Sequence, residues 1–313
     1  MRNNGLTSMN KEWNDEISNK RNVATFLNDL RLLFKGPVLI ANVLPVFTGF
    51  WLAVHFSGSS IIGYLDLFWL TMVGSTLVMA GALAINNWYD VDIDSIMNRT
   101  KNRPTVTGHF SLKTVLIIGL LLTIFGLTLL MFVSMESAIY AFIGWFTYVV
   151  LYTVWSKRRY SLNTVIGSVS GAVSPLIGWA AIQSSFQLVP IILFLILFIW
   201  QMPHTFAIAI RKYDDYKAAN VAMLPVVYGL SVTKRQIFVY TVCLLPLPFY
   251  LISLGTTFIV IASLLNVAGV IVSLLGFFAK DDMKWARLVF LFSVNYIMVL
   301  FLSMVLVTLP VFK

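Results

Sequence analysis

The sequence carries few charged residues and a single cysteine. Charged side chains make up 11% of its 313 residues, whereas a soluble globular protein carries roughly 25%. One cysteine, Cys243, leaves no internal disulfide framework and no thiolate metal site. The chain also lacks a Walker loop and the patterns GxGxxG, HExxH and GxSxG. A soluble domain, a disulfide-stabilised module and these four common enzyme sites are therefore excluded.

Apolar residues are instead abundant and form nine long runs. Hydrophobic residues make up 59% of the chain, and each run is close to the ~20 residues that cross a bilayer as a helix. Because a helix satisfies its own backbone polar groups in lipid, we predict an all-α polytopic membrane protein with nine transmembrane helices in one bundle. The predicted spans are 37–56, 65–87, 112–133, 137–155, 162–182, 188–210, 235–254, 257–279 and 286–308.

The positive charges are distributed unevenly between the loops. With a cytoplasmic N-terminus, 21 of the 22 Lys and Arg residues fall on the cytoplasmic side and only Lys313 falls outside. This asymmetry predicts an N-terminus inside and a C-terminus outside a cell membrane, and it accounts for the net charge of +9 without a nucleic-acid partner. We expect residues 1–36 to be a cytoplasmic lead without a signal peptide, amphipathic over 26–34, and residues 37–313 to form the membrane domain.

The stretch from Asn86 to Gly108 contains an oxygen-rich motif at the end of the second predicted span. Asn86, Asp90 and Asp94 are spaced i, i+4, i+8, so on a helix they point the same way, whereas Asp92 lies on the opposite side. Carboxylates at a membrane edge suit Mg²⁺, a hard cation usually held by one or two carboxylates and substrate phosphates. The spacing predicts that Asn86, Asp90 and Asp94 are metal ligands.

Basic residues follow this motif directly and recur later in the chain. Arg99, Lys101 and Arg103 come next in the sequence, and cations beside metal-binding carboxylates indicate a site for a metal diphosphate. The alternative is an ordinary charged cytoplasmic loop. The patch 157–159, which contains Lys157 and Arg158, either determines topology only or places one or two cations on a phosphate.

A second polar stretch, Trp200 to Gly229, ends the sixth predicted span. His204, Arg211 and Asp215 are spaced i, i+7, i+11 and fall near one line on a helix. Both polar stretches close with similar phrases, PTVTG and PVVYG, which indicate either a weak internal repeat or a chance likeness of short turns. A repeat would bring both stretches to one cytoplasmic mouth. Pro203 and Pro175 are expected to kink their helices.

Three phrases of the sequence resemble a known family. The motif NxxxDxxxD followed by RTKNRP resembles the first motif of UbiA-type intramembrane prenyltransferases. YTVWSKRRYSLNTVIGSVSGAVSPLIGWAA and WQMPHTFAIAIRKYDDYKAANVAMLPVV bring the match closer to the protohaem IX farnesyltransferase family within that superfamily. The phrases cover roughly residues 86–229, and the layout of spans covers nearly the whole chain.

This resemblance implies a helical bundle around a central cavity and a specific reaction. The reaction combines haem B, farnesyl diphosphate and water to give haem O and diphosphate, for haem-copper terminal oxidases, with Mg²⁺ as cofactor and haem B as substrate. Asn86, Asp90 and Asp94 match the family's Mg²⁺–diphosphate motif, and Asp215 matches the second motif as a further metal ligand. The diphosphate would contact basic side chains. These are Arg99, Lys101, Arg103, Lys157, Arg158, Arg211 and Lys217.

His204 is the predicted haem-binding and catalytic residue of the second stretch. It is expected to face the cavity, where a neutral imidazole could ligate haem iron; the alternative is a buried histidine bonded to a backbone carbonyl freed by Pro203. Expected partners are the lipid bilayer and, among proteins, haem A synthase or oxidase assembly factors. Three other functions stay open: a UbiA-type enzyme acting on a quinone precursor or other aromatic acceptor, a transporter or channel, and a non-catalytic assembly factor.

Overall fold

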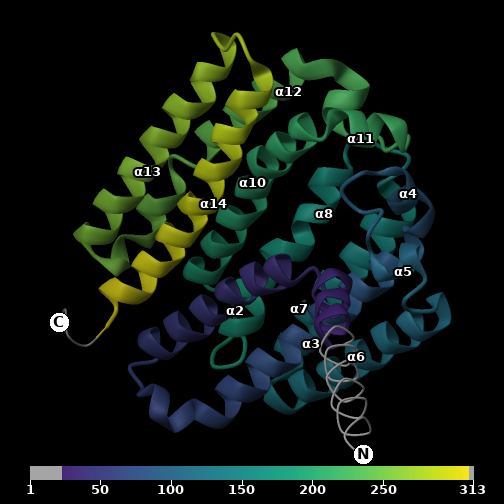
Figure 1. Cartoon of the computed structure of the whole chain (residues 1–313). Helices are drawn as coiled ribbons and strands as arrows, with labels where there is room; N and C mark the ends of the chain where they lie inside the picture. The colour runs from purple at the N-terminus through teal and green to yellow at the C-terminus, as the bar shows by residue number, and fades with distance from the viewer. Residues whose placement is uncertain (1–22, 310–313) are drawn as a thin grey trace, which may run out of the picture.

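The computed structural model describes residues 23–309, and these residues fold entirely into helices, turns and loops. A helix over residues 23–33 precedes the first membrane span. The later elements, seen in Figure 1, follow in this order: α2 Gly36–Phe56, η1 Ile61–Tyr64, α3 Leu65–Tyr89, α4 Val91–Ile96, α5 Pro104–Thr107, α6 Leu112–Val133, α7 Met135–Phe146, η2 Thr147–Ser156, α8 Asn163–Ala172, α9 Ser174–Trp179, α10 Leu188–Arg211, α11 Tyr213–Ala218, α12 Leu224–Cys243, η3 Leu247–Leu254, α13 Thr256–Leu274, η4 Leu275–Phe277 and α14 Asp282–Val307.

Eight of these helical stretches are long and apolar enough to cross a membrane. They overlap eight of the nine predicted spans, although the stretch Leu224–Leu254 begins well before the predicted 235–254. The exception is the predicted span 162–182, which the structure divides into the short helices α8 and α9. Pro175 stands in the first turn of α9, and because proline has no N–H and fits best at a helix start, a new helix begins there. By contrast, α10 continues from Leu188 to Arg211 through Pro203.

Glycines let neighbouring helices approach closely in two places. A side chain at Gly178 of α9 would collide with the carbonyl oxygen of Val46 on α2, and one at Gly49 of α2 would collide with the carbonyl oxygen of Pro175. Gly81 on α3 and Gly119 on α6 pack in the same way, each against the other's carbonyl oxygen. Helices in lipid associate largely through such close packing, so these contacts fix how α2, α3, α6 and α9 cross.

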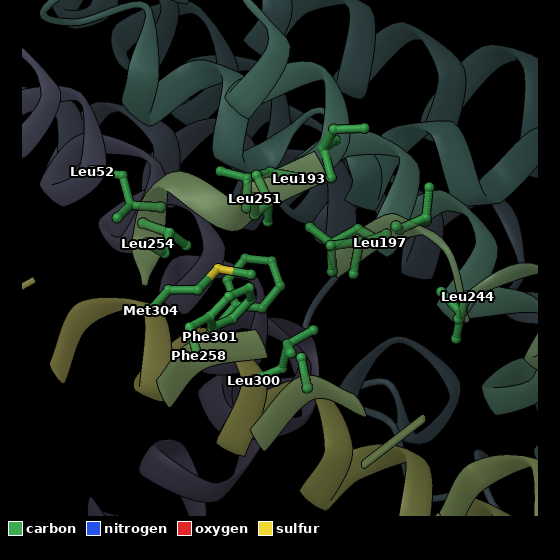
Figure 2. Packing of buried hydrophobic residues seen from close by; sticks show 14 of the residues in the cluster. Leu52, Leu193, Leu197, Leu244, Leu251, Leu254, Phe258, Leu300, Phe301 and Met304 are labelled. Atoms are coloured by element: carbon green, nitrogen blue, oxygen red, sulfur yellow. The ribbon is translucent and has the colours of Figure 1, made fainter. Parts of the chain in front are cut away.

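A large apolar core joins the second half of the chain to α2. It gathers buried side chains from α2, α10, η3, α13 and α14, among them Leu52, Leu193, Leu251, Phe258 and Phe301. Figure 2 shows these side chains converging between the helices. A hydrogen bond from Trp51 Nε1 to Thr308 Oγ1, at 2.8 Å, also ties α2 to the end of α14. The core makes the first and last spans neighbours.

A cavity of about 250 Å³ lies in the other half of the bundle. Its wall is mostly apolar and comes from α2, α3, α7, η2, α8, α9 and α10. Tyr148 and Tyr152 of η2 line it, as do Gln201 and Thr205 of α10. The short helices α4, α5 and α11 lie together to one side of the long helices (Figure 1).

The crossing of α2 and α9 gives a stability prediction. Gly178→Ala should destabilise the protein by about 1–3 kcal/mol, because its new Cβ would overlap the backbone of α2 and force the helices apart. The thermal unfolding midpoint in detergent measures this change. Gly63→Ala is the matched control, since nothing lies within 4 Å of a Cβ at Gly63. Equal midpoints for the two variants would show that the crossing is not tightly packed.

Candidate functional site

The predicted oxygen motif is buried at the junction of α3 and α4. Asn86 lies in the last turns of α3, Asp90 stands between α3 and α4, and Asp94 lies in α4. Asn86, Asp90 and Asp94 are 1%, 0% and 2% exposed, whereas Asp92 is exposed to solvent. The prediction that Asp92 faces away from the other three residues is therefore confirmed.

The amide of Asn86 connects three separate segments of the chain. Its Nδ2 donates to Asp90 Oδ2 at 2.7 Å and to Thr153 Oγ1 at 2.9 Å. Its Oδ1 accepts a hydrogen bond from Lys35 Nζ. Both amide hydrogens and the carbonyl are thus used, so the side chain has one orientation. Asn86 thereby joins η2 and the residue before α2 to the carboxylate of Asp90.

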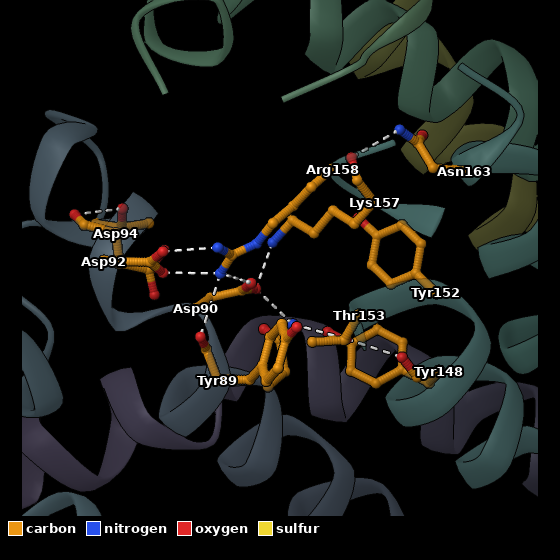
Figure 3. A network of polar contacts seen from close by, with 12 residues as sticks. Tyr89, Asp90, Asp92, Asp94, Tyr148, Tyr152, Thr153, Lys157, Arg158 and Asn163 are labelled. Carbon is orange, nitrogen blue, oxygen red and sulfur yellow. Dashed lines mark hydrogen bonds and ion pairs between the residues drawn. The ribbon is translucent and has the colours of Figure 1, made fainter. Parts of the chain in front are cut away.

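Each carboxylate of the motif is paired with a different cation, and Figure 3 shows the pair of Asp90 and Lys157. Asp90 pairs with Lys157, which follows η2. Asp94 pairs with Arg103, nine residues further along the chain. A buried carboxylate needs such a partner because an unpaired buried charge is strongly destabilising. The predicted diphosphate-binding residues Arg103 and Lys157 are therefore part of the site.

Arg158 joins the exposed side of the same cluster. Its two terminal nitrogens donate to the two oxygens of Asp92 at 2.6 and 2.7 Å, and Nη2 lies 3.6 Å from Asp90 Oδ1. Its guanidinium also lies over the ring of Tyr89, 5.1 Å from the centroid. The hydrogen bonds from Arg158 hold the pKa of the Asp92 carboxyl below its usual range and raise the pKa of Arg158.

The sequence analysis missed Lys35 as a site residue. Lys35 directly precedes α2, and its ammonium contacts Asn86 and, at 3.3 Å, the hydroxyl of Tyr148. Burial, reinforced by the nearby cations Arg103 and Lys157, holds the pKa of Lys35 well below its usual range. In the sequence, Lys35 is one of several basic residues of the lead. All of them were used only to predict the membrane topology, so none was considered as a site residue.

The segment η2 is a π-helix of ten residues. Thr153 Oγ1 donates to the carbonyl oxygen of Tyr148, five residues back, at 2.8 Å and accepts from Asn86. The rings of Tyr148 and Tyr152 stack with centroids 5.6 Å apart. The π-helical turn thus directs two aromatic rings, a hydroxyl and Lys157 toward the site. Such turns are frequent at functional sites, but no simple sequence pattern marks them.

The two polar stretches meet, as a repeat would require. The backbone N–H of Asn98 donates to Asp215 Oδ1 at 3.3 Å, and the guanidinium of Arg99 lies over the ring of Tyr216. Ile93 and Tyr216 belong to one buried apolar cluster. The loop after α4 and the helix α11 therefore close the same end of the bundle.

Three other predicted phosphate-binding residues contact none of the acidic side chains of the motif. Lys101 donates to Asn98 Oδ1 at 3.2 Å. Arg211 lies over the ring of Phe290, 4.7 Å from the centroid, and Lys217 lies over the ring of Tyr213. Sequence proximity placed Lys101 with the cluster, but its side chain points along the loop. Their predicted contacts with diphosphate stay predictions.

His204 does not face the cavity, contrary to the expectation. Its Nδ1 lies 2.9 Å from Ser293 Oγ of α14, and its ring lies between Trp200 and Phe290, with centroid distances of 4.8 and 5.2 Å. Arg211 also contacts Phe290, so His204 and Arg211 share a face of α10 as predicted, but this face meets α14. Asp215 does not belong to it, because it lies on the separate helix α11. A helix turns by 100° per residue, and Thr205, the next residue, lines the cavity instead.

Ser293 bonds Nδ1 of this imidazole. Its hydroxyl oxygen also lies 2.7 Å from the carbonyl oxygen of Phe290, to which it can donate its single hydrogen. When it does, the hydroxyl oxygen accepts from His204 in the tautomer that carries its proton on Nδ1. The alternative expected from sequence, a bond to a carbonyl freed by Pro203, is wrong, because Nδ1 bonds a hydroxyl of another helix.

Oxygen donors of the motif fit a divalent cation. Asp90 Oδ1 is buried and has no hydrogen-bond partner, and carboxylate and amide oxygens are the ligands that Mg²⁺ prefers. Within residues 23–309, no group of three or more Asp, Glu, His or Cys side chains is gathered for a metal. Asp90 and Asp94 offer two carboxylates, and their role as metal ligands, like that of Asp215 as a further ligand, stays a prediction.

A model of the UbiA prenyltransferase family matches residues 42–296 of the sequence, which include most of α2 and all of α3, η2 and α10. The chain belongs to the UbiA prenyltransferase family. Membership makes it an integral membrane enzyme that transfers prenyl groups, and the site described above lies in the matched region except for Lys35.

Two bacterial relatives of this UbiA-family chain are similar over nearly their whole length. "Protoheme IX farnesyltransferase" of Oceanobacillus iheyensis is 56% identical over 301 residues, which are 96% of each chain. "Protoheme IX farnesyltransferase 2" of Bacillus subtilis is 52% identical over 285 residues, which are 91% of this chain and 93% of the relative.

Solved structures share the UbiA fold. A structure of digeranylgeranylglyceryl phosphate synthase matches with a TM-score of 0.72 at 20% identity, covering 90% of this chain and 98% of that one. A UbiA homologue from Archaeoglobus fulgidus, bound to DMAPP and Mg²⁺, matches with a TM-score of 0.68 at 14% identity, covering 87% and 99%. At these identities the likeness shows a common fold.

Proposed function

We propose that the chain transfers a farnesyl group from farnesyl diphosphate to a vinyl group of haem B, giving haem O. The observation that carries this proposal is the buried set Asn86, Asp90 and Asp94, surrounded by cations beside an apolar cavity. The names of the relatives support farnesyl as the donor group and haem as the acceptor. Haem O would then serve haem-copper terminal oxidases.

The reaction breaks the allylic carbon–oxygen bond, the π bond of the vinyl group and one O–H bond of water, and it forms two new bonds. The bond between the allylic carbon and the diphosphate oxygen breaks, and a carbon–carbon bond forms to the terminal vinyl carbon of haem. Water adds oxygen to the adjacent carbon and releases a proton. Negative charge develops on the leaving diphosphate, so fixed positive groups that meet it lower the barrier.

The side chains of the motif would hold the metal and the diphosphate together. Asn86, Asp90 and Asp94 offer the oxygen ligands, and a bound Mg²⁺ would stabilise the charge of the leaving diphosphate. Lys157 and Arg103 already lie beside these carboxylates and would donate to phosphate oxygens. Arg99, Arg158 and the more distant cations would extend this positive region at the mouth.

The cavity would take the prenyl chain and exclude water from it. Its apolar wall comes from seven helical segments, and Tyr148 and Tyr152 line the cavity while Tyr148 also reaches Lys35 of the ionic cluster. An allylic cation formed there is shielded from solvent water. The cavity therefore separates the reactive carbon from water until the acceptor is present.

His204 would bind the acceptor from the side of α14. In the tautomer with the proton on Nδ1, the bond to Ser293 would leave the lone pair of Nε2 for haem iron, and metal-ligating histidines commonly donate their other ring N–H in this way. Haem and the prenyl chain would then approach α10 on different faces, because Gln201 and Thr205 line the cavity and His204 does not.

The topology read from the loops completes the proposal. The N-terminus and the mouth would lie in the cytoplasm, where phosphorylated substrates are made, and the C-terminus would lie outside. Residues 37–313 would form the membrane domain, although the contact between Lys35 and Asn86 brings the end of the lead into the site. Haem A synthase and oxidase assembly factors are the protein partners expected with this activity.

The decisive experiment is an assay of membranes that contain the protein. Incubation with haem B and farnesyl diphosphate should give a haem heavier by one farnesyl group and one water, detected by mass spectrometry. Product from an aromatic quinone precursor, with none from haem B, would assign the enzyme to another acceptor. Absence of any prenylated product would refute the proposed activity.

Substitution of the buried acidic residues should lower the rate of catalysis much more than substitution of the exposed one. Asp90→Ala or Asp94→Ala should lower kcat by about 10²–10³-fold, because each deletes a fixed partner of the metal diphosphate. Asp92→Ala should be mild, because an exposed ion pair contributes little. The rates of haem O formation by equal amounts of membrane-inserted protein measure this difference. Equal loss in all three variants would contradict the separate roles.

The proposed haem ligand can be tested by absorption spectroscopy. His204→Ala should shift the Soret band of purified protein loaded with haem B, because the iron loses an imidazole, and it should leave farnesyl diphosphate binding nearly intact. Ser293→Ala keeps the imidazole and removes its partner, so it should give a smaller shift. An unchanged spectrum in His204→Ala would restrict this histidine to packing between α10 and α14.

A further inference from the structure

The turn between the helix 23–33 and α2 holds Lys35 in an unusual conformation. Its backbone angles are φ 47° and ψ 53°, in the left-handed region. A residue with a side chain pays a steric cost there and adopts it only where its surroundings demand it. This backbone conformation therefore indicates that the contacts of the Lys35 side chain with Asn86 and Tyr148 hold the turn in place.

Several contacts hold this turn against the site. Asn87, next to Asn86, donates through Nδ2 to the carbonyl oxygen of Leu33 at 2.6 Å. Leu33 is fully buried. The carboxyl of Asp29 lies 2.8 Å from Nδ1 of His109, in the loop after α5. The helix 23–33 is thus docked on the end of α3 and on the loop that follows Arg103.

The charges around Lys35 do not balance. Asp90 pairs with Lys157, Asp94 with Arg103, and Asp92 with Arg158. Over residues 23–309, no carboxylate oxygen lies within 4 Å of Lys35, which contacts only the uncharged Asn86 and Tyr148. A partly buried ammonium with two neutral partners is costly to keep. The site therefore holds one cation more than its carboxylates neutralise, which favours an anionic ligand.

We propose that Lys35 binds the diphosphate of the prenyl donor, and that Asn87 is the positioning residue that holds its turn in place. This inference rests on the proposed function only in taking the substrate anion to be a diphosphate. Lys35 reaches the same Asn86 oxygen that is offered to the metal, so its ammonium lies where a phosphate oxygen would arrive. The segment before the first span then becomes part of the active site.

Calorimetric titration of the purified full-length protein with inorganic diphosphate and Mg²⁺ tests the assignment directly. Lys35→Gln should weaken diphosphate binding by about 10- to 100-fold, as expected for the loss of a charged hydrogen bond. Arg31→Gln is the matched control, because it removes the same charge from an exposed position on the helix that precedes Lys35. Equal affinities of the two variants would overturn the proposal.

A second variant separates binding from folding. Lys35→Gly removes the cation and relieves the left-handed backbone, so its thermal midpoint should equal or exceed that of the unchanged protein while diphosphate binding falls as in Lys35→Gln. A lowered midpoint with full affinity would show that Lys35 is structural, and would overturn the proposal.

Steady-state kinetics test the positioning role of Asn87. Asn87→Ala should raise KM for farnesyl diphosphate more than it lowers kcat, because Lys35 is still present but less well placed, and Asn87→Gln should recover part of the loss. An unchanged KM would remove the positioning role. Failure of haem O formation, with Lys35-dependent diphosphate binding intact, would refute the proposed acceptor and leave the assignment of Lys35 standing.

Discussion

The burial of Asp90 at the end of a membrane-spanning helix is the constraint on which the site depends. A carboxylate with no exposed surface must find positive or hydrogen-bonding partners. Lys157 and the amide of Asn86 supply them. Through the same amide the residue before α2 is also attached, by Lys35. Segments far apart in the chain therefore converge on one carboxylate, and their convergence shapes the mouth of the bundle.

Close helix packing makes this convergence possible. Gly81 and Gly119 bring α3 against α6, and Gly49 and Gly178 bring α2 against α9. These crossings place the end of α3 beside the start of α2 while a cavity remains between α3, η2 and α8. The second half of the bundle has an extensive apolar core instead. One half of the molecule thus contains the cavity and the ionic cluster, and the other half contains the tightly packed apolar core.

The sequence predicted the features that have a simple period or composition. The apolar runs located eight spans, and helical spacing placed Asn86, Asp90 and Asp94 on one buried side with Asp92 outside. The predicted kink at Pro175 corresponds to the break between α8 and α9, but the apolar composition gave no sign that the span would be divided into two short helices.

Features that depend on tertiary contacts were not predictable in this way. Lys35 lies 51 residues from Asn86, and its contact depends on a left-handed turn that no local pattern announces. For His204 the spacing correctly gave a face shared with Arg211, since both contact Phe290. Spacing cannot say which neighbouring helix a face will meet, so the orientation toward the cavity was wrong.

The charge arrangement has a consequence for how substrate would bind under the proposed function. Asp90 and Asp94 are already neutralised by Lys157 and Arg103, and Lys35 adds a further cation. A free divalent cation would therefore enter a region that is already positive, which is unfavourable at short range. A metal that arrives with its diphosphate brings negative charge for these three cations to meet. Under the proposed function, Lys35, Arg103 and Lys157 would contact phosphate oxygens of a bound diphosphate, and Asp90 and Asp94 would then be available to hold the metal.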